Sequence, residues 1–204
     1  MTDVLPGHLI TLDPQAQAQL FTEARTANTF TDTPVSDEQL RAIFDLAKYP
    51  PTAMNVQPLR VLFVRPGDGR DRLLTHVAEG NRAKTATAPV VAVLAADTDF
   101  HEHLDTVFPI RPGMREHFAA DPATRDGMAR FNAGLQVGYF LLAVRAAGLA
   151  AGPMGGFDAT GVDNEFFTGT GWKSLLLVNI GHPGPDAWHP RLPRLDYDTV
   201  VRHA

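Results

Sequence analysis

The sequence predicts a single domain of the α+β class. A continuous apolar run at 88–97, with no alternation, is typical of a strand covered on both faces. Apolar residues at helical spacing over most of the circumference of 122–147 predict a long buried helix. A chain of 204 residues with 44% hydrophobic content is long enough for one sizeable core. Since no repeat or shift of composition indicates a boundary, we expect one domain over 1–204.

Four elements are expected in the N-terminal half. Residues Pro14–Thr26 are compatible with a helix. A Ser-x-x-Gln capping box begins a second helix over Ser36–Lys48, which two prolines terminate. The β-rich run 60–66 predicts a strand followed by a turn, and helical spacing resumes over Arg70–Glu79.

The C-terminal half is less regular. Residues 98–122 contain prolines and glycines among scattered His, Arg and Phe, and predict a long irregular excursion. The glycine-rich stretch "GPMGGFD", 152–158, is unsuited to a helix and makes a poor strand. Asp158 is expected to cap a short helix, and Ser174–Gly181 to form a strand. The tail "RLPRLDYDTVV" has no obvious partner within the fold.

Composition excludes several classes of function. A net charge of −5 without any Lys/Arg run argues against nucleic acid as a partner. No apolar stretch approaches the roughly 20 residues of a membrane span, and the N-terminus does not resemble a signal peptide, so a cytoplasmic location without membrane partners is expected. The absence of cysteine excludes thiolate ligands and a cysteine nucleophile.

Common catalytic motifs are missing as well. His101 and His103 in "FHEHLD" invite a metal hypothesis, but the chain has no HExxH spacing, and a surface loop explains them better. We therefore expect no metal site. The chain has no GxSxG elbow, no GxGxxG after a strand and no P-loop.

What remains is a set of polar residues at the ends of predicted elements, each unremarkable alone. They are Arg25, Thr26, Asn55, Gln57, Asn81, Lys84, Arg191 and Arg194, together with the loop "PMGGF".

In combination, these residues resemble a known family. The run "ARTANTFTDTPVSDEQLRAIFDLAKYPPTAMNVQPLRVLFV" resembles the opening of the FMN-dependent nitroreductase superfamily, with its Arg-x-Ser-x-Arg/Lys segment and Pro-Ser-x-x-Asn-x-Gln-Pro turn. "EGNRAKTATAPVVAVLA" and "GLAAGPMGGFD" resemble two later segments of that family. More narrowly, "FFTGTGWKSLLLVNIGHP" and "RLPRLDYDT" resemble the malonic semialdehyde reductase branch associated with pyrimidine degradation.

The resemblance implies a nitroreductase-like fold, with a central, mostly antiparallel sheet flanked by helices, in an intertwined homodimer with FMN at the interface. It implies an N-terminal arm at 1–13 and a C-terminal arm, from about 185 to 204, that lies on the dimer partner. The buried helix 122–147 suits a dimer, because a chain this short supplies little cover for it.

Site residues follow by motif position. The resemblance assigns the FMN phosphate to Arg25 and Arg191, with Arg194 nearby, and the family's serine hydroxyl to Thr26. Asn28 stands where many members have Arg or Lys. The remaining implied contacts to the flavin ring or ribityl chain are Thr52, Ala53, Asn55 and Gln57 in the turn, Asn81 and Lys84 at the pyrimidine edge, and Pro153, Met154, Gly155 and Gly156 at the edge that carries N5.

The implied activity is that of an FMN-dependent NAD(P)H oxidoreductase that reduces malonic semialdehyde to 3-hydroxypropanoate by ping-pong hydride transfer through flavin N5, without a catalytic side chain. Arg111 or Arg115 in the excursion is a hypothesis for binding the substrate carboxylate. Two alternatives stay open: a broad-specificity nitroaromatic or quinone reductase, and a non-enzymatic protein that binds or sequesters flavin.

Overall fold

The computed structural model describes residues 9–204. Most of the N-terminal arm expected at 1–13 therefore lies outside the described residues. The α-helices are α1 (Pro14–Gln17), α2 (Asp37–Ala47), α3 (Asp68–Thr75), α4 (Glu79–Thr87), α5 (Leu104–Val107), α6 (Met114–Ala120), α7 (Pro122–Ala146), α8 (Ala159–Phe166) and α9 (Tyr197–Val200). A π-helical turn follows α1 at Ala18–Thr22, and short 3-10 turns lie at Ala53–Asn55 and Phe100–His103.

Four strands form one sheet in the order β1-β2-β4-β3, and every neighbouring pair is antiparallel. The strands are β1 (Leu59–Val64), β2 (Val90–Asp97), β3 (Ala150–Met154) and β4 (Trp172–Gly181). The prediction of an α+β fold with a central antiparallel sheet flanked by helices is confirmed.

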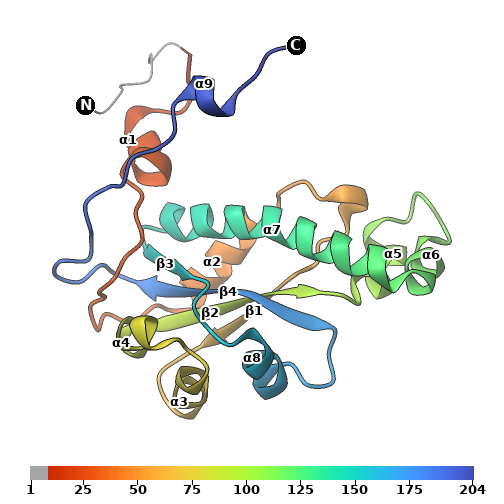
Figure 1. Ribbon diagram of the computed structural model, residues 1–204, viewed down its shortest axis with the longest axis horizontal. Helices are drawn as coiled ribbons and strands as arrows, with labels where there is room; N and C mark the ends of the chain where they lie inside the picture. Colours follow the sequence, from red (N-terminus) through yellow and green to blue (C-terminus); the bar gives the residue numbers. More distant parts are fainter. Residues whose placement is uncertain (1–8) are drawn as a thin grey trace.

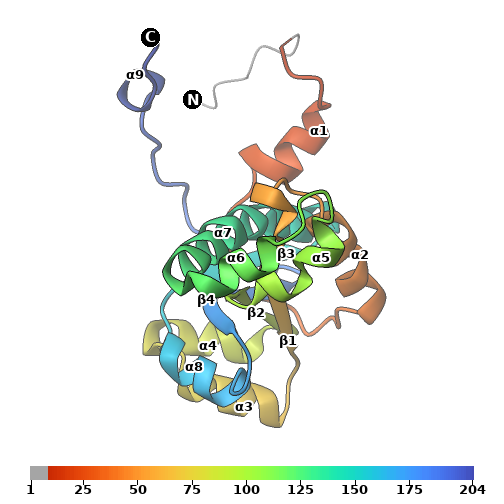
Figure 2. The same ribbon diagram turned by 90° about the vertical axis from the view of Figure 1, so that its right-hand side faces the viewer.

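Helices cover both faces of this sheet. Figures 1 and 2 show α2 and α7 on one face and α3, α4 and α8 on the other. Because side chains alternate along a strand, Ala92 and Leu94 of β2 pack with α2 and α7, whereas Val91 and Val93 pack with α3 and α8. Every residue of β2 is buried. The apolar run without alternation was thus a central strand covered on both faces, as predicted.

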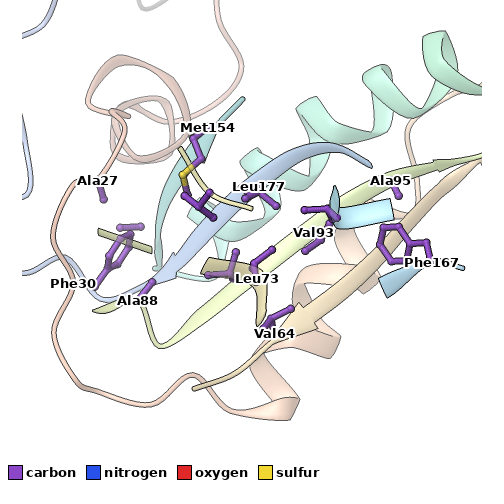
Figure 3. Packing of buried hydrophobic residues seen from close by; sticks show 14 residues of the cluster. Ala27, Phe30, Val64, Leu73, Ala88, Val93, Ala95, Met154, Phe167 and Leu177 are labelled. Atoms are coloured by element: carbon purple, nitrogen blue, oxygen red, sulfur yellow. The ribbon is translucent and has the colours of Figure 1, made fainter. Parts of the chain in front are cut away.

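The core cluster that packs between the sheet and helices α3 and α8 reaches the edge of the sheet. Figure 3 shows Leu73 of α3 beside Val93 and Leu177 of the two central strands, and the same cluster continues to Ala27 and Met154. The positions of Ala27 and Met154 are therefore fixed by packing.

Helix α7 has two different sides. Phe140 and Val144 are buried against the sheet, and the predicted long helix is confirmed. Phe131, Leu135 and Tyr139, spaced four residues apart, are exposed by 69%, 42% and 45%. Within one chain this helix is therefore covered on one side only.

Two local predictions were wrong. The excursion at 98–122 contains the short helices α5 and α6 and a 3-10 turn, because Phe100, Leu104 and Phe118 pack into a third core cluster. Residues 150–154 form a strand in spite of Gly152 and Pro153, since β3 pairs along one side only with β4. Tertiary packing overrode the local signals in both places.

Helix boundaries also differ. The helix expected over Arg70–Glu79 ends at Thr75, and a new helix, α4, begins at Glu79, so Asn81 and Lys84 lie inside α4 rather than after a helix. The first helix ends at Thr22 instead of Thr26.

The terminal helices α1 and α9 lie at the same end of the molecule (Figure 1). Figures 1 and 2 show α1 and α9 beyond α7, away from the sheet. The expectation that the tail has no partner within the fold was wrong for its first residue, because Arg191 donates to the carbonyl oxygens of Thr22 and Ala24. No helix within residues 9–204 is both long and apolar enough to cross a bilayer.

Candidate functional site

The segment that carries Arg25, Thr26 and Asn28 runs beside β3. The Ala27 N–H donates to the carbonyl of Ala151 at 3.0 Å. Gly152 makes this close approach possible, because a Cβ at that position would lie 2.7 Å from the carbonyl oxygen of Ala27. The segment and the strand therefore form one surface.

An arginine-lined cavity opens at the start of this surface. It has a volume of about 260 Å³, and no carboxylate belongs to its lining. The Arg25 Nε is buried and has no hydrogen-bond partner within residues 9–204. Five predicted residues meet here, together with His189: Arg25, Thr26, Asn28, Arg191 and Arg194. Three guanidinium groups line this cavity without a carboxylate among the lining residues, a donor set that suits an anion such as a phosphate.

The tail is held against the cavity by its own arginine. Arg191 Nη2 donates to the carbonyl oxygens of Thr22 at 2.5 Å and Ala24 at 3.1 Å. Burial, followed by the nearby charge of Arg191, lowers the pKa of Arg145 at the end of α7. The positive potential therefore extends beyond the three lining arginines.

Two more predicted residues meet at the far end of β3. Asn81 Nδ2 of α4 donates to the carbonyl of Gly156 at 3.2 Å. A Cβ at Gly156 would lie 2.5 Å from that nitrogen. The close approach of α4 therefore requires glycine at position 156, which the sequence did not reveal. Gly155, by contrast, faces open space, with no atom within 4 Å of a Cβ built there.

Lys84 lies one helical turn after Asn81, on the same face of α4. Its ammonium group forms no hydrogen bond or ion pair with any residue in the part of the chain that the structure describes. The predicted residues Pro153 and Met154 connect this end to the arginine cavity. Gly156 is the fifth residue after Ala151, so the two ends lie about 16 Å apart along extended chain.

The turn at 52–57 is strained and lies apart from β3 and the arginine cavity. Met54, Asn55 and Gln57 have φ values of 50°, 53° and 42°, which non-glycine residues rarely adopt. Strain of this kind costs on the order of 1–3 kcal/mol per residue and persists only where the surroundings enforce it. Here the enforcing contacts include the Thr52 hydroxyl, which accepts from the Gln57 N–H at 3.3 Å.

Two buried amides of α7 also hold this turn, and the sequence analysis missed them. Asn132 Oδ1 accepts from the Ala53 N–H at 2.8 Å, and Gln136 Oε1 accepts from the Leu59 N–H at 2.9 Å. Asn132 and Gln136 are only 2% and 4% exposed. Their i, i+4 spacing on an otherwise apolar helix was the signal that could have identified them.

One chain does not bring the turn to the arginine cavity. The turn is bonded to Asn132, whereas Gln19, near the cavity, donates to the carbonyl of Arg145 at 2.6 Å. Thirteen residues of α7 separate these two contacts, or about 20 Å along the helix axis. Figure 1 shows α5 and α6 at one end of α7 and β3 at the other. The predicted site residues thus form two groups at opposite ends of the molecule.

The arginines and histidines of the excursion also have distinct surroundings. Arg115 forms an ion pair with Glu102, whereas Arg111 is exposed in a turn between α5 and α6. His103 is exposed, but His101 is buried, with its Nε2 3.3 Å from Nη1 of Arg125. The prediction that a surface loop holds both histidines was therefore wrong for His101.

The fold defines an α+β protein with helices on both faces of an antiparallel sheet, and comparisons with known proteins give the family. The nitroreductase family matches residues 22–182. A Streptomyces coelicolor protein named as an NADH dehydrogenase/NAD(P)H nitroreductase is 57% identical over 196 residues, which cover 96% of each chain. This chain therefore belongs to the nitroreductase family, whose members are oxidoreductases that use FMN.

Solved structures agree on the fold. A nitroreductase from Bacillus subtilis has a TM-score of 0.78 at 22% identity, covering 94% of this chain and 100% of that chain. A nitroreductase from Exiguobacterium sibiricum, solved in complex with FMN, has a TM-score of 0.76 at 20% identity, covering 89% of this chain and 93% of that chain.

Proposed function

We propose that this protein is an FMN-dependent NAD(P)H oxidoreductase whose FMN lies along β3. The observation that carries the proposal is one continuous surface. It joins the arginine-lined cavity, through Pro153 and Met154, to Gly155 and to Lys84, which is unpaired within residues 9–204. An elongated ligand with an anionic end and a flat polar ring matches this order of groups. The chemistry that FMN supplies when bound is hydride transfer between NAD(P)H and an oxidising substrate.

The residues present fit that ligand. Arg25 has a buried Nε without a hydrogen-bond partner within residues 9–204, and its Nη2 lies 3.9 Å from Glu23, a distant pair that leaves much of the charge of the three lining arginines available to a ligand. At the other end, Gly155 leaves room for a ring edge to approach the main chain. Lys84 would place a positive charge near that ring, which favours a reduced, anionic ligand.

A second copy of the chain would complete the site. The exposed stripe of Phe131, Leu135 and Tyr139 on α7 is apolar, and no atom lies within 4 Å of a Cβ built at Gly134 or Gly138. A partner helix could therefore approach this face closely. In a homodimer formed through α7, the strained turn of one chain would reach the arginine cavity of the other, with the C-terminal arm lying on the partner.

For the substrate we propose malonic semialdehyde, reduced with NAD(P)H and a proton to 3-hydroxypropanoate. The support is the likeness of the segments 152–158, 166–183 and 191–199 to the malonic semialdehyde reductase branch. The runner-up is a broad nitroaromatic or quinone reductase, which the NAD(P)H nitroreductase name of the relative with 57% identity favours.

The test has two stages. Flavin content after purification, and FMN affinity after removal and reconstitution, should fall at least tenfold in Arg25→Gln but not in Arg72→Gln, whose guanidinium lies on α3. Equal FMN affinity in both variants would contradict the assignment. The ratio of kcat/KM for malonic semialdehyde to that for a nitroaromatic then decides between the two substrates. Failure of NADH and NADPH to bleach the flavin anaerobically would leave only a flavin-binding protein.

A further inference from the structure

The excursion between β2 and α7 is fixed to the strained turn. Asn55 Nδ2 donates to the carbonyl of Val107 at 2.8 Å, at the last residue of α5. Met54, Val107 and Phe108 pack together against the third core cluster. Because of these contacts, the excursion lies beside whichever flavin the turn approaches.

A short loop of this excursion is stiff and anchored at both ends. Phe108 packs against the core before it, and Met114, 9% exposed, is buried after it. Pro109 and Pro112 restrict the backbone between these anchors. The loop therefore presents its side chains with little conformational entropy left to lose on binding.

This loop displays one apolar and one cationic side chain. Ile110 is 82% exposed, and Arg111 is exposed beside it. No carboxylate occurs from Phe108 to Met114, and within residues 9–204 the Arg111 guanidinium has no ion-pair or hydrogen-bond partner.

The other two guanidinium groups of this region are engaged. Arg115 is paired with Glu102. Arg125 lies 3.9 Å from a carboxylate oxygen of Asp99 and 3.3 Å from His101 Nε2. Among the arginines of residues 98–125, Arg111 is thus the one whose charge no carboxylate in the described part of the chain compensates.

We propose that Arg111, and not Arg115, binds the carboxylate of the substrate, so that the site selects short carbonyl compounds that carry an anionic group. The proposal rests on the function proposed above. A phosphate of the nicotinamide nucleotide has the same attraction for a guanidinium, so the experiment must separate these two anions.

The direct probe is malonate, a dianion that cannot be reduced, titrated calorimetrically into the FMN-loaded protein. We expect the Kd of malonate to rise about tenfold in Arg111→Gln and to change less than twofold in the matched control Arg115→Gln, with partial recovery in Arg111→Lys. Because calorimetry does not need turnover, the malonate affinity can be measured whichever compound the enzyme reduces.

Steady-state kinetics supply the second arm. In Arg111→Gln we expect the KM for malonic semialdehyde to rise about tenfold, while kcat/KM for propanal, a neutral aldehyde, stays unchanged. Unchanged malonate affinity in Arg111→Gln would overturn the proposal. A raised KM for NADPH or NADH with unchanged malonate affinity would also overturn it, by assigning the charge to the nucleotide. If the wild-type protein shows no NAD(P)H-dependent quinone reduction, that result would instead contradict the proposed function.

Discussion

Arg70 provides the sharpest test of the physical reasoning. Its side chain is 2% exposed and reaches from α3 into the space between β1 and the end of α4. Nη1 donates to the carbonyl oxygens of Thr85 at 2.7 Å and Ala88 at 2.8 Å, and Nη2 donates to that of Val64 at 2.8 Å. Within the described chain no carboxylate forms an ion pair with this guanidinium, and burial lowers the pKa of Arg70 to about 10.

The variant Arg70→Met keeps the apolar stem and removes all three donors. A buried carbonyl left without a donor costs about 1–3 kcal/mol. Removal of the buried charge offsets part of this loss, because the guanidinium no longer has to be desolvated. We expect a net loss of about 3 kcal/mol in the free energy of unfolding.

Urea denaturation of the purified protein at fixed FMN concentration measures this loss. With an m-value of about 2–3 kcal/mol/M, the midpoint should fall by about 1 M. The control Arg72→Met lies two residues away on α3, with its guanidinium in exposed ion pairs to Asp68 and Glu165, and should have a much smaller effect. Equal midpoint shifts in the two variants would refute the argument, since buried and exposed guanidinium groups would then be equivalent.

Other contacts yield three further predictions. Gly152→Ala, whose Cβ would meet the Ala27 carbonyl oxygen at 2.7 Å, should weaken FMN binding at least tenfold by fluorescence titration, whereas Gly80→Ala, with open space at its Cβ, should not. Asn132→Leu removes the acceptor of the part-buried Ala53 N–H and should lower the free energy of unfolding by about 1 kcal/mol in urea titrations; an unchanged value would contradict this role. Leu135→Glu should yield monomers by light scattering, and a persisting dimer would exclude this face of α7 as the interface.

Local patterns predicted much of the fold. The capping box at Ser36 was found as predicted, with Ser36 accepting from the Gln39 N–H and Gln39 accepting from the Ser36 N–H. The buried β2 and the long α7 also follow from periodicity alone. The strand at Gly152 and Pro153 could not be predicted in this way, because its stability comes from pairing with β4 about 25 residues later.

The candidate site could likewise be predicted only in part from the sequence. Motif resemblance selected Arg25, Thr26, Asn28, Arg191 and Arg194, and the fold brings all five to one cavity. The same resemblance selected the 52–57 turn, which the fold holds about 20 Å away along α7, by contacts with buried amides whose partners the sequence does not reveal.

By itself, the sequence determined the types of most elements and the central position of β2, because these depend on local periodicity. Its resemblance to a known family then selected the residues suited to an anionic, polar-ringed ligand. Only the tertiary structure decided that Gly156 is required by the approach of Asn81, that Arg115 is neutralised while Arg111 is not, and that the site residues of one chain lie in two groups. The physical reason is that these properties are distances between residues far apart in the chain, which only the packing of the elements fixes.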